Sequence, residues 1–305
     1  MLSTGNILKN RILIIGSNGM LGQRLLEYYK KDNFTEIFCA SVEPESFIKD
    51  IDYKQTDITN KNDIKALMRA FYPDVVINAA AYTNVDKCET EKETAWKINA
   101  LAVENIAKYS FAYNAHLIHI STDYVFDGLN GPYTEEDKVN PVSYYGRTKL
   151  AGENAINSSN VKYTIIRTNV LYGPAKHGRM DFVKWVVNSL REGKNINIVT
   201  DQINNPTYID DLVKGIDSAA RLSKEGLFNI GGAEFLSRLD FTYRIADFFN
   251  LDKNLIKPIE TRELNQPAKR PLKSGLINLK SERDLFYKPL GVEETFALMK
   301  NELNL

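Results

Sequence analysis

The feature that most constrains the fold is a strand, a glycine turn and a helix near the start of the chain. Residues 11–15 (RILII) are a short apolar run of strand length, residues 16–22 (GSNGMLG) carry three glycines, and residues 23–31 are mostly helix formers. This order is the context that a dinucleotide-binding turn requires. The glycines let backbone N–H groups approach a pyrophosphate at the start of the helix, where the helix dipole favours negative charge. An ordinary strand-to-helix turn is the alternative interpretation.

Continued alternation of strands and helices predicts an α/β fold, a doubly wound parallel sheet of the Rossmann type with a smaller C-terminal substrate lobe. Strands are expected at residues 11–15, 36–40, 74–81, 116–120 and 163–167, and helices at residues 61–71, 91–111 and from residue 144 onward. Later strands are expected at residues 197–199 and 227–230, and later helices at about 209–222 and 237–249. We expect a dinucleotide-binding domain over residues 1–170, completed by parts of 195–230, and an interleaved substrate-binding lobe formed mainly by residues 171–305.

Composition and charge argue against several classes of protein. Lys plus Arg and Asp plus Glu both total 39 of 305 residues with no long run of one sign, which argues against nucleic-acid and membrane partners. The two cysteines, Cys39 and Cys88, predict a reduced compartment without a disulfide framework. Residues 1–11 hold no apolar export segment, and no stretch approaches the ~18 apolar residues of a membrane helix, so we expect a cytoplasmic protein. The three histidines have no carboxylate or cysteine at metal-ligand spacing, so we expect no metal.

A second motif, Tyr145-x-x-x-Lys149, points to acid–base chemistry. Residues four apart on a helix share one face and can reach the same ligand. A free phenol titrates near pH ~10, and a nearby ammonium group would lower its pKa toward the working range. The hydroxyl of Thr122, just after the strand at 116–120, would face the same crevice as Tyr145. This spacing is common on helix surfaces, so its weight comes from the combination with the glycine turn.

The residues that would select the cofactor leave the choice between NAD and NADP open. The strand at 36–40 is followed by Ser41, Val42 and Glu43. A carboxylate here favours a free 2′-hydroxyl on the ribose, and an arginine favours a 2′-phosphate. Ser41 suits either, Glu43 comes late and is expected to face solvent, and no arginine follows, so we expect permissive cofactor use. Asp57 either contacts adenine or serves as a helix cap or turn residue.

Four stretches carry a resemblance to a known family. They are residues 78–87 (NAAAYTNVDK), residues 121–128 (STDYVFDG), residues 145–153 (YGRTKLAGE), and Asp201-Gln202 with Pro206-Thr207. On these motifs the chain resembles, over nearly its whole length, the extended short-chain dehydrogenases and more narrowly the dTDP-4-dehydrorhamnose reductases. The resemblance implies NAD(P)H-dependent reduction of the C4 keto group of a nucleotide-linked 4-keto-6-deoxyhexose, with dTDP-4-dehydrorhamnose the closest candidate. It also implies a slight lean to NADPH; we expect a nucleotide-sugar substrate and allow for a homodimer.

The resemblance implies roles for residues at matching positions. Tyr145, Lys149 and Thr122 would be catalytic, and Asn99 would also anchor a proton-relay water. The cofactor-binding residues would be Gly16, Gly19, Met20, Leu21, Gly22, Asp57, Ile58, Ala81, Tyr82, Thr83, Asn99, Tyr145 and Lys149. The substrate-binding residues would be Thr122, Asp123, Tyr124 and Val170. Met20 stands where the family often has Gln, and Val170 where some members carry a Trp that packs on the sugar.

Two alternatives use much of the same motif set. The first is a sugar-nucleotide epimerase or dehydratase; dehydratases of this superfamily commonly place Asp-Glu after the threonine, whereas here Tyr124 follows Asp123. The second is a non-catalytic regulatory protein, because the regulatory β subunit of methionine adenosyltransferase resembles the same family. A binding module can keep an intact pocket, so the motifs alone do not separate it from an enzyme.

Overall fold

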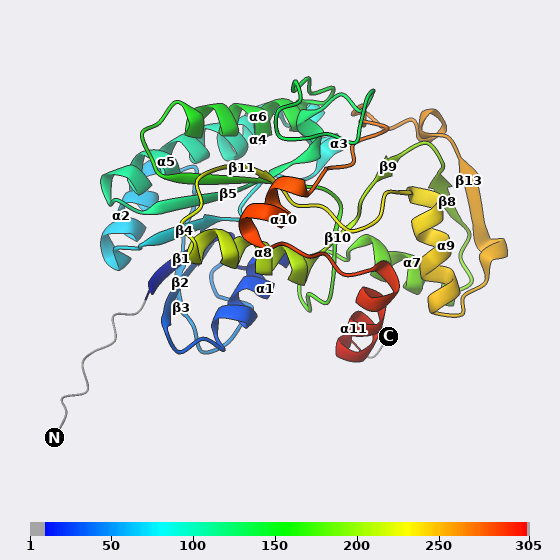
Figure 1. The fold of residues 1–305 in the computed structure, drawn as a ribbon, viewed down its shortest axis with the longest axis horizontal. Helices are drawn as coiled ribbons and strands as arrows, with labels where there is room; N and C mark the ends of the chain where they lie inside the picture. Colours follow the sequence, from blue (N-terminus) through cyan, green and yellow to red (C-terminus); the bar gives the residue numbers. More distant parts are fainter. Residues whose placement is uncertain (1–9, 304–305) are drawn as a thin grey trace.

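A parallel seven-stranded sheet forms the centre of the computed structural model, which describes residues 10–303 (Figure 1). The strand order is β11-β6-β5-β4-β1-β2-β3. The bounds are β1 (Asn10–Ile15), β2 (Thr35–Ser41), β3 (Asp52–Gln55), β4 (Val75–Asn78), β5 (His116–Thr122), β6 (Tyr163–Thr168) and β11 (Gly226–Asn229). From β1, the strands are added on one side through β2 and β3 and on the other side through β4, β5, β6 and β11. Doubly wound sheets bind ligands at the carboxyl ends of the strands where this direction reverses, here between β1 and β4. Residues 1–11, where we expected no export segment, lie mostly outside the described residues.

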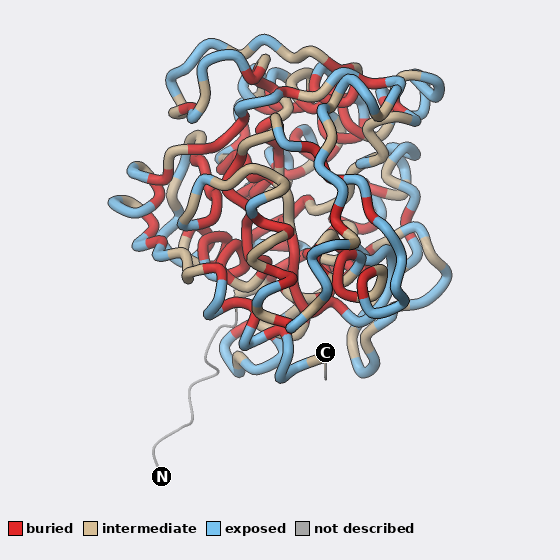
Figure 2. Tube along the Cα trace, turned by 90° about the vertical axis from the view of Figure 1, so that its right-hand side faces the viewer, coloured by how far each residue is buried: buried red, intermediate tan, exposed pale blue. Residues whose placement is uncertain are grey.

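Helices cover both faces of this sheet, which confirms the predicted doubly wound α/β class. The helices α1 (Met20–Tyr29) and α8 (Ile209–Arg221) pack on one face, and α2 (Lys61–Phe71), α5 (Ala102–Ala112) and α6 (Tyr144–Asn157) on the other. In β1, Ile12 and Ile14 join the first core while Leu13 and Ile15 join the second. Successive side chains of a strand point to opposite faces, so a strand covered on both sides is apolar throughout. Figure 2 shows the buried segments concentrated inside the tube trace.

The second half of the chain also builds a smaller lobe beside the sheet (Figure 1, right). Its core is formed by α7 (Phe182–Arg191), β8 (Ile196–Val199), α9 (Arg238–Phe248), β13 (Ile256–Ile259) and α11 (Val292–Leu303). Of the segment 195–230 expected to complete the sheet, α8 and β11 do so, whereas β8 pairs with β13 in the lobe. The reason is packing, because Ile196 and Ile198 belong to the lobe's own core. Two short pairs, β7 (Leu171–Tyr172) with β10 (Thr207–Tyr208) and β9 (Ile203–Asn204) with β12 (Leu236–Ser237), lie between these parts of the chain.

Several elements differ from expectation. The strand β3 was not predicted because its sequence, DYKQ, is polar; it pairs only with β2 at the sheet edge, where one side needs no apolar cover. The expected helix over 91–111 is broken into α4 (Lys92–Trp96), a π-helical turn (Lys97–Leu101) and α5, and a short helix, α3 (Val85–Thr90), precedes it. The remaining helix is α10 (Leu279–Leu285).

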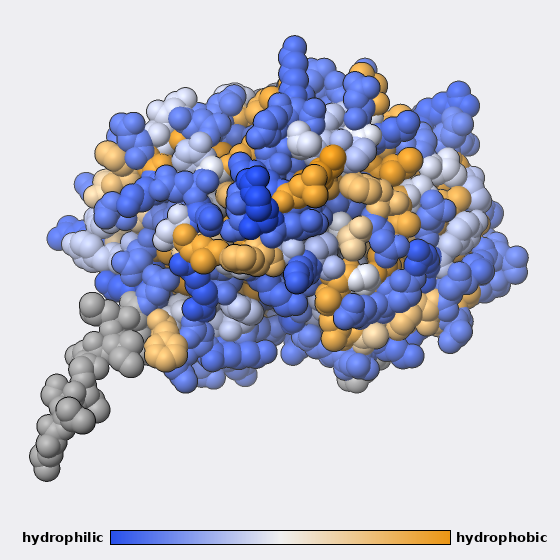
Figure 3. All heavy atoms as spheres, viewed as in Figure 1, coloured by the Kyte–Doolittle hydropathy of each residue, from blue (hydrophilic) through white to orange (hydrophobic). Residues whose placement is uncertain are grey.

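The face of the molecule shown in Figure 3 is mostly polar. Hydrophilic residues cover most of the face in Figure 3, with smaller hydrophobic areas between them. Among residues 10–303, no helix has the length and apolar character needed to cross a membrane.

Candidate active site

Two adjoining pockets lie along the carboxyl ends of β1, β4 and β5, and they share Gly19, Ala79 and Ala81. We call them the Asp57 pocket and the Tyr145 pocket. Of the predicted site residues, those lining the Asp57 pocket are Gly16, Gly19, Asp57, Ile58 and Ala81. Those lining the Tyr145 pocket are Gly19, Met20, Leu21, Ala81, Thr83, Thr122, Asp123, Tyr124, Tyr145, Lys149 and Val170. The Tyr145 pocket has a volume of about 620 Å³, within the range of pockets that hold small ligands.

The glycine turn joins the two pockets, and its three glycines serve different purposes. Gly16 has a φ of +82°, and a Cβ there would lie 2.6 Å from the Ala80 nitrogen. A Cβ at Gly22 would lie 2.3 Å from the Gly16 oxygen, so this glycine lets α1 pack on the turn. A Cβ at Gly19 would lie 3.2 Å from the Gly16 oxygen, with no other described atom within 4 Å, and Gly19 itself lines both pockets.

The start of α1 suits an anion. Gly19 is the N-cap, and no described side chain makes a capping hydrogen bond there. The first turn of α1 also carries no acidic residue. The first N–H groups of a helix lack partners within the helix and favour negative charge. The open face at Gly19 and the uncapped helix start therefore fit the pyrophosphate of a dinucleotide.

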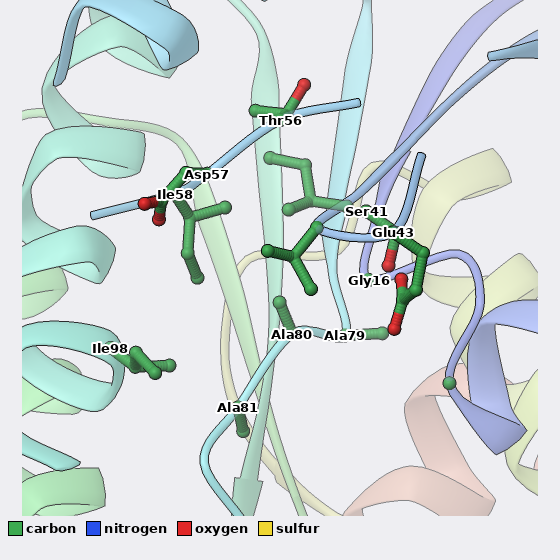
Figure 4. Close-up of a pocket in the computed structure, with 13 residues that line it drawn as sticks. Gly16, Ser41, Glu43, Thr56, Asp57, Ile58, Ala79, Ala80, Ala81 and Ile98 are labelled. Carbon is green, nitrogen blue, oxygen red and sulfur yellow. The ribbon is translucent and has the colours of Figure 1, made fainter. Parts of the chain in front are cut away.

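At the far end, the Asp57 pocket is formed by loops after β2 and β3 (Figure 4). The Asp57 carboxylate accepts hydrogen bonds from the Thr59 N–H at 2.9 Å and the Thr59 hydroxyl at 2.8 Å. Asn60, not Asp57, caps α2 by accepting from the Asn62 N–H. Asp57 is thus a turn residue that also lines the pocket beside Ile58.

We expected Glu43 to face solvent, but the structure places it differently. Its side chain is half-buried, lines the Asp57 pocket and accepts a 3.2 Å hydrogen bond from the Asn18 side-chain amide. The physical cause is that Asn18, in the glycine turn, also donates to the Glu45 carbonyl and accepts from the Phe47 N–H. These bonds fold the loop after β2 back over the turn, and no pattern in the sequence marks this contact.

At the other end, the Tyr145 pocket gathers buried polar groups. The helix α6 begins after Ser143, whose hydroxyl accepts from the Gly146 N–H, and this start places Tyr145 in the first turn. The relative exposure of Thr122 is 6%, of Tyr145 8% and of Lys149 2%. The Tyr124 ring packs edge-on against the Tyr145 ring with 5.5 Å between centroids. The structure therefore brings the three predicted catalytic residues to one cavity.

Burial controls the titration of these groups. It raises the pKa of the Tyr145 phenol above its usual range, and a hydrogen bond with Thr122 acts in the opposite direction. Burial lowers the pKa of the Lys149 amine to about 8. We expected Lys149 to lower the pKa of Tyr145, but the Lys149 amine is directed elsewhere: it donates to the Ile120 carbonyl at 2.7 Å and lies 3.3 Å from His119 Nε2.

His119 belongs to a buried polar chain that the sequence-based interpretation missed. Asn78 Oδ1 accepts from the Ala80 N–H at 3.2 Å, so Asn78 Nδ2 donates to His119 Nδ1 at 3.1 Å. The neutral imidazole then carries its proton on Nε2, facing Lys149. The available signal was the place of His119 between two apolar residues, Ile118 and Ile120, of β5.

Asp123 is buried beside this centre. Its carboxylate accepts from the Thr122 hydroxyl at 3.0 Å and from the Ser274 hydroxyl at 2.5 Å. Burial raises the pKa of Asp123 to about 6, although both hydrogen bonds act to lower it. Ser274 was not predicted as a site residue, because it reaches Asp123 from 151 positions further along the chain.

Asn99 and Tyr82 are among the described residues but outside the linings of both pockets. The Asn99 amide accepts from the Tyr82 N–H at 2.8 Å and donates to the Tyr82 carbonyl and to the Thr148 hydroxyl. Asn99 therefore fixes the loop after β4, and its direct contact with a cofactor or a relay water stays a prediction. The Tyr82 hydroxyl is hydrogen-bonded to Glu91. Within residues 10–303, no group of three or more His, Cys, Asp or Glu side chains could hold a metal ion.

Comparison with known proteins decides the family. Residues 10–304 match the family described as RmlD substrate binding domain. A dTDP-4-dehydrorhamnose reductase of Aggregatibacter actinomycetemcomitans is 31% identical over 291 residues, which cover 92% of this chain and 94% of that protein. The chain belongs to this family.

Membership in the RmlD family confirms the resemblance seen in the sequence and the Rossmann-type fold. The crystal structure of a dTDP-4-dehydrorhamnose reductase from Bacillus anthracis in complex with NADP superposes with a TM-score of 0.87 at 32% identity, covering 97% of this chain and all of that one. The chain is also similar to a protein with a different name. The methionine adenosyltransferase 2 subunit beta of Bos taurus is 31% identical over 262 residues, 83% of this chain and 76% of that protein.

Proposed function

We propose that this chain is an NAD(P)H-dependent oxidoreductase that reduces the C4 keto group of a nucleotide-linked 4-keto-6-deoxyhexose, with dTDP-4-dehydrorhamnose converted to dTDP-rhamnose as the leading candidate. The observation that carries the proposal is the single groove in which the glycine turn adjoins Thr122, Tyr145 and Lys149. The named reductases in the family support this substrate class. When bound, the reduced nicotinamide would supply the hydride.

The chain's own residues would handle the proton. The raised pKa of Tyr145 keeps its hydroxyl protonated at neutral pH, so it can donate to the oxygen that gains charge. To hold that oxygen, the Thr122 hydroxyl would donate its one proton to it in place of Asp123. Lys149 would hold the ribose hydroxyls. Gly16, Gly19 and the start of α1 would hold the pyrophosphate, and Asp57 with Ile58 the adenine.

One alternative keeps a specific observation in its favour. The methionine adenosyltransferase subunit is as similar in sequence as the first reductase, at 31% identity. A regulatory role would therefore leave the groove able to bind a dinucleotide without turnover. The dehydratase alternative is weaker, because Tyr124 stands where an acidic partner of Asp123 would be needed, and Asp123 already accepts from Thr122 and Ser274. A homodimer and a cytoplasmic location stay predictions.

A turnover assay tests the proposal. Purified chain is mixed with dTDP-4-dehydrorhamnose and either NADH or NADPH, and loss of reduced cofactor is followed together with formation of the hydroxy sugar. We expect one cofactor oxidised per sugar reduced. Tight dinucleotide binding with no turnover would contradict the proposal and favour the regulatory alternative.

A further inference from the structure

We propose that Glu43 binds the adenosine ribose of the cofactor and makes this chain select NADH over NADPH. This inference rests on the proposed function, because it concerns the cofactor of the same groove. It departs from the expectation of permissive cofactor use with a slight lean to NADPH, which assumed that Glu43 faces solvent.

The position of the Glu43 carboxylate carries the argument. Glu43 comes two residues after the end of β2 and lines the Asp57 pocket together with Ser41 and Gly16. Figure 4 shows its carboxylate beside Gly16 and Ala79, on the inner side of the loop. In dinucleotide-binding sheets the adenosine ribose lies between the end of the second strand and the glycine turn. The carboxylate is therefore placed where the ribose 2′ position would lie.

Hydrogen bonds hold Glu43 in this position. Asn18, itself only 4% exposed, donates to Glu43 Oε2 at 3.2 Å and to the Glu45 carbonyl at 2.9 Å. The Tyr53 hydroxyl is hydrogen-bonded to the Glu43 carbonyl. Gln23 in turn donates to the Asn18 carbonyl at 2.8 Å. The same turn that would hold the pyrophosphate thus also orients the carboxylate, and among the described residues none donates to the second carboxylate oxygen.

The charge around the ribose position favours a hydroxyl over a phosphate. None of the described residues that line the Asp57 pocket is arginine or lysine, and its two charged residues, Glu43 and Asp57, are both acidic. A 2′-hydroxyl can donate a hydrogen bond to a carboxylate. A 2′-phosphate carries negative charge and would meet a fixed carboxylate with no cation to offset it. The NADP complex of the Bacillus anthracis relative shows that a family member can bind NADP, so the selection would be a property of this chain's own loop.

The test is a binding titration of the full chain with NADH and with NADPH, read by calorimetry without any sugar substrate. We expect NADH to bind at least about tenfold more tightly, the effect of one charge-assisted hydrogen bond. Glu43→Gln keeps the shape and removes the charge, so the affinity ratio should fall toward one, mainly because NADPH binds better. Glu45→Gln makes the same charge change at an exposed neighbour and should leave the ratio as in the parent.

The outcomes separate the inference from the function on which it rests. Equal affinities in the parent, or an unchanged ratio in Glu43→Gln, would overturn the role of Glu43 while leaving dinucleotide binding intact. Binding of neither dinucleotide would overturn the proposed function and the inference together. If the ratio of the two affinities also falls in Glu45→Gln, the specific role of Glu43 would be overturned. The selectivity would then come from the total negative charge of the loop.

Discussion

The two ends of the groove are built on different principles. At the Asp57 pocket the charged side chains are half-buried or exposed, as Glu43 and Asp57 are, and the glycine turn presents backbone to the ligand. At the Tyr145 pocket Asp123, Tyr145 and Lys149 are all buried, and burial shifts the pKa of each. Binding needs only shape and accessible charge, whereas proton transfer benefits from groups whose pKa has been moved. The comparison predicts that changes at the two ends affect different measured quantities.

The largest expected effect is on turnover, from Tyr145→Phe. The substitution keeps the ring packing against Tyr124 and removes only the hydroxyl, so kcat should fall by a factor of about 10² or more. The dissociation constant for the dinucleotide should stay within about twofold. Steady-state kinetics and a cofactor titration on the same preparation measure both. Tyr144→Phe is the matched control, since Tyr144 is the neighbour that does not line the pocket among the described residues, and it should retain parental turnover. Equal activity in the two variants would remove Tyr145 from its role.

The next effect is on affinity, from Gly19→Val. Gly19 lines both pockets, and a branched side chain there would occupy space that the pyrophosphate needs, so the dissociation constant for the dinucleotide should rise about tenfold or more. The melting temperature should also fall somewhat, because a Cβ there lies 3.2 Å from the Gly16 backbone oxygen and Val is a poor N-cap residue. Gly291→Ala, where nothing described lies within 4 Å of the added Cβ, is the control and should leave both quantities unchanged. Unaltered affinity in Gly19→Val would make the turn purely structural.

A smaller effect concerns the free energy of unfolding and comes from Lys149 in the Tyr145 pocket. The pKa of Lys149 is about 8 in the folded chain and near 10.4 when unfolded, so between these values the unfolded chain binds more protons. Stability should therefore rise as the pH increases from about 8 to about 10. Lys149→Met should remove this rise and increase the free energy of unfolding at pH 7 by about 1 kcal/mol, because no charge has to be buried. Urea denaturation at several pH values measures it. The same pH dependence in parent and variant would show that Lys149 is not the group responsible.

The smallest expected effect concerns Asp123. Its pKa is raised to about 6 in the folded chain, so between about pH 4 and 6 the folded chain binds more protons than the unfolded chain. Stability should therefore fall as the pH rises through this window. Asp123→Asn should flatten the curve, again by urea denaturation. A curve that keeps its slope in the variant would assign the titration to another group.

Much of the fold and of the Tyr145 pocket was predictable, because the sequence patterns that indicate them are local. The apolar run of β1, the three glycines and the start of α1 follow one another in the sequence, and Tyr145 and Lys149 are four residues apart on one helix. The family comparison confirms the α/β fold that these patterns predicted. The strand β3 escaped prediction because an edge strand needs few apolar residues.

The features that escaped prediction depend on contacts between distant segments. The inward pose of Glu43 requires the Asn18 side chain from another loop, 25 residues earlier. The contact of Ser274 with Asp123 spans most of the chain, and the alignment of Asn78, His119 and Lys149 requires two neighbouring strands and a helix. The strand β8 has the composition of a strand of the central sheet. Its place in the smaller lobe follows only from its pairing with β13 and its packing against α9.

The central claim is that this single groove reduces a keto sugar with hydride from the dinucleotide. The most direct test follows the hydrogen itself: the chain is incubated with dTDP-4-dehydrorhamnose and NADH that carries deuterium at both positions of nicotinamide C4. We predict one deuterium at C4 of the product sugar for each cofactor oxidised, and a transfer slowed by a factor of about 10² or more in Tyr145→Phe. Unchanged sugar with the labelled cofactor still bound would contradict the claim.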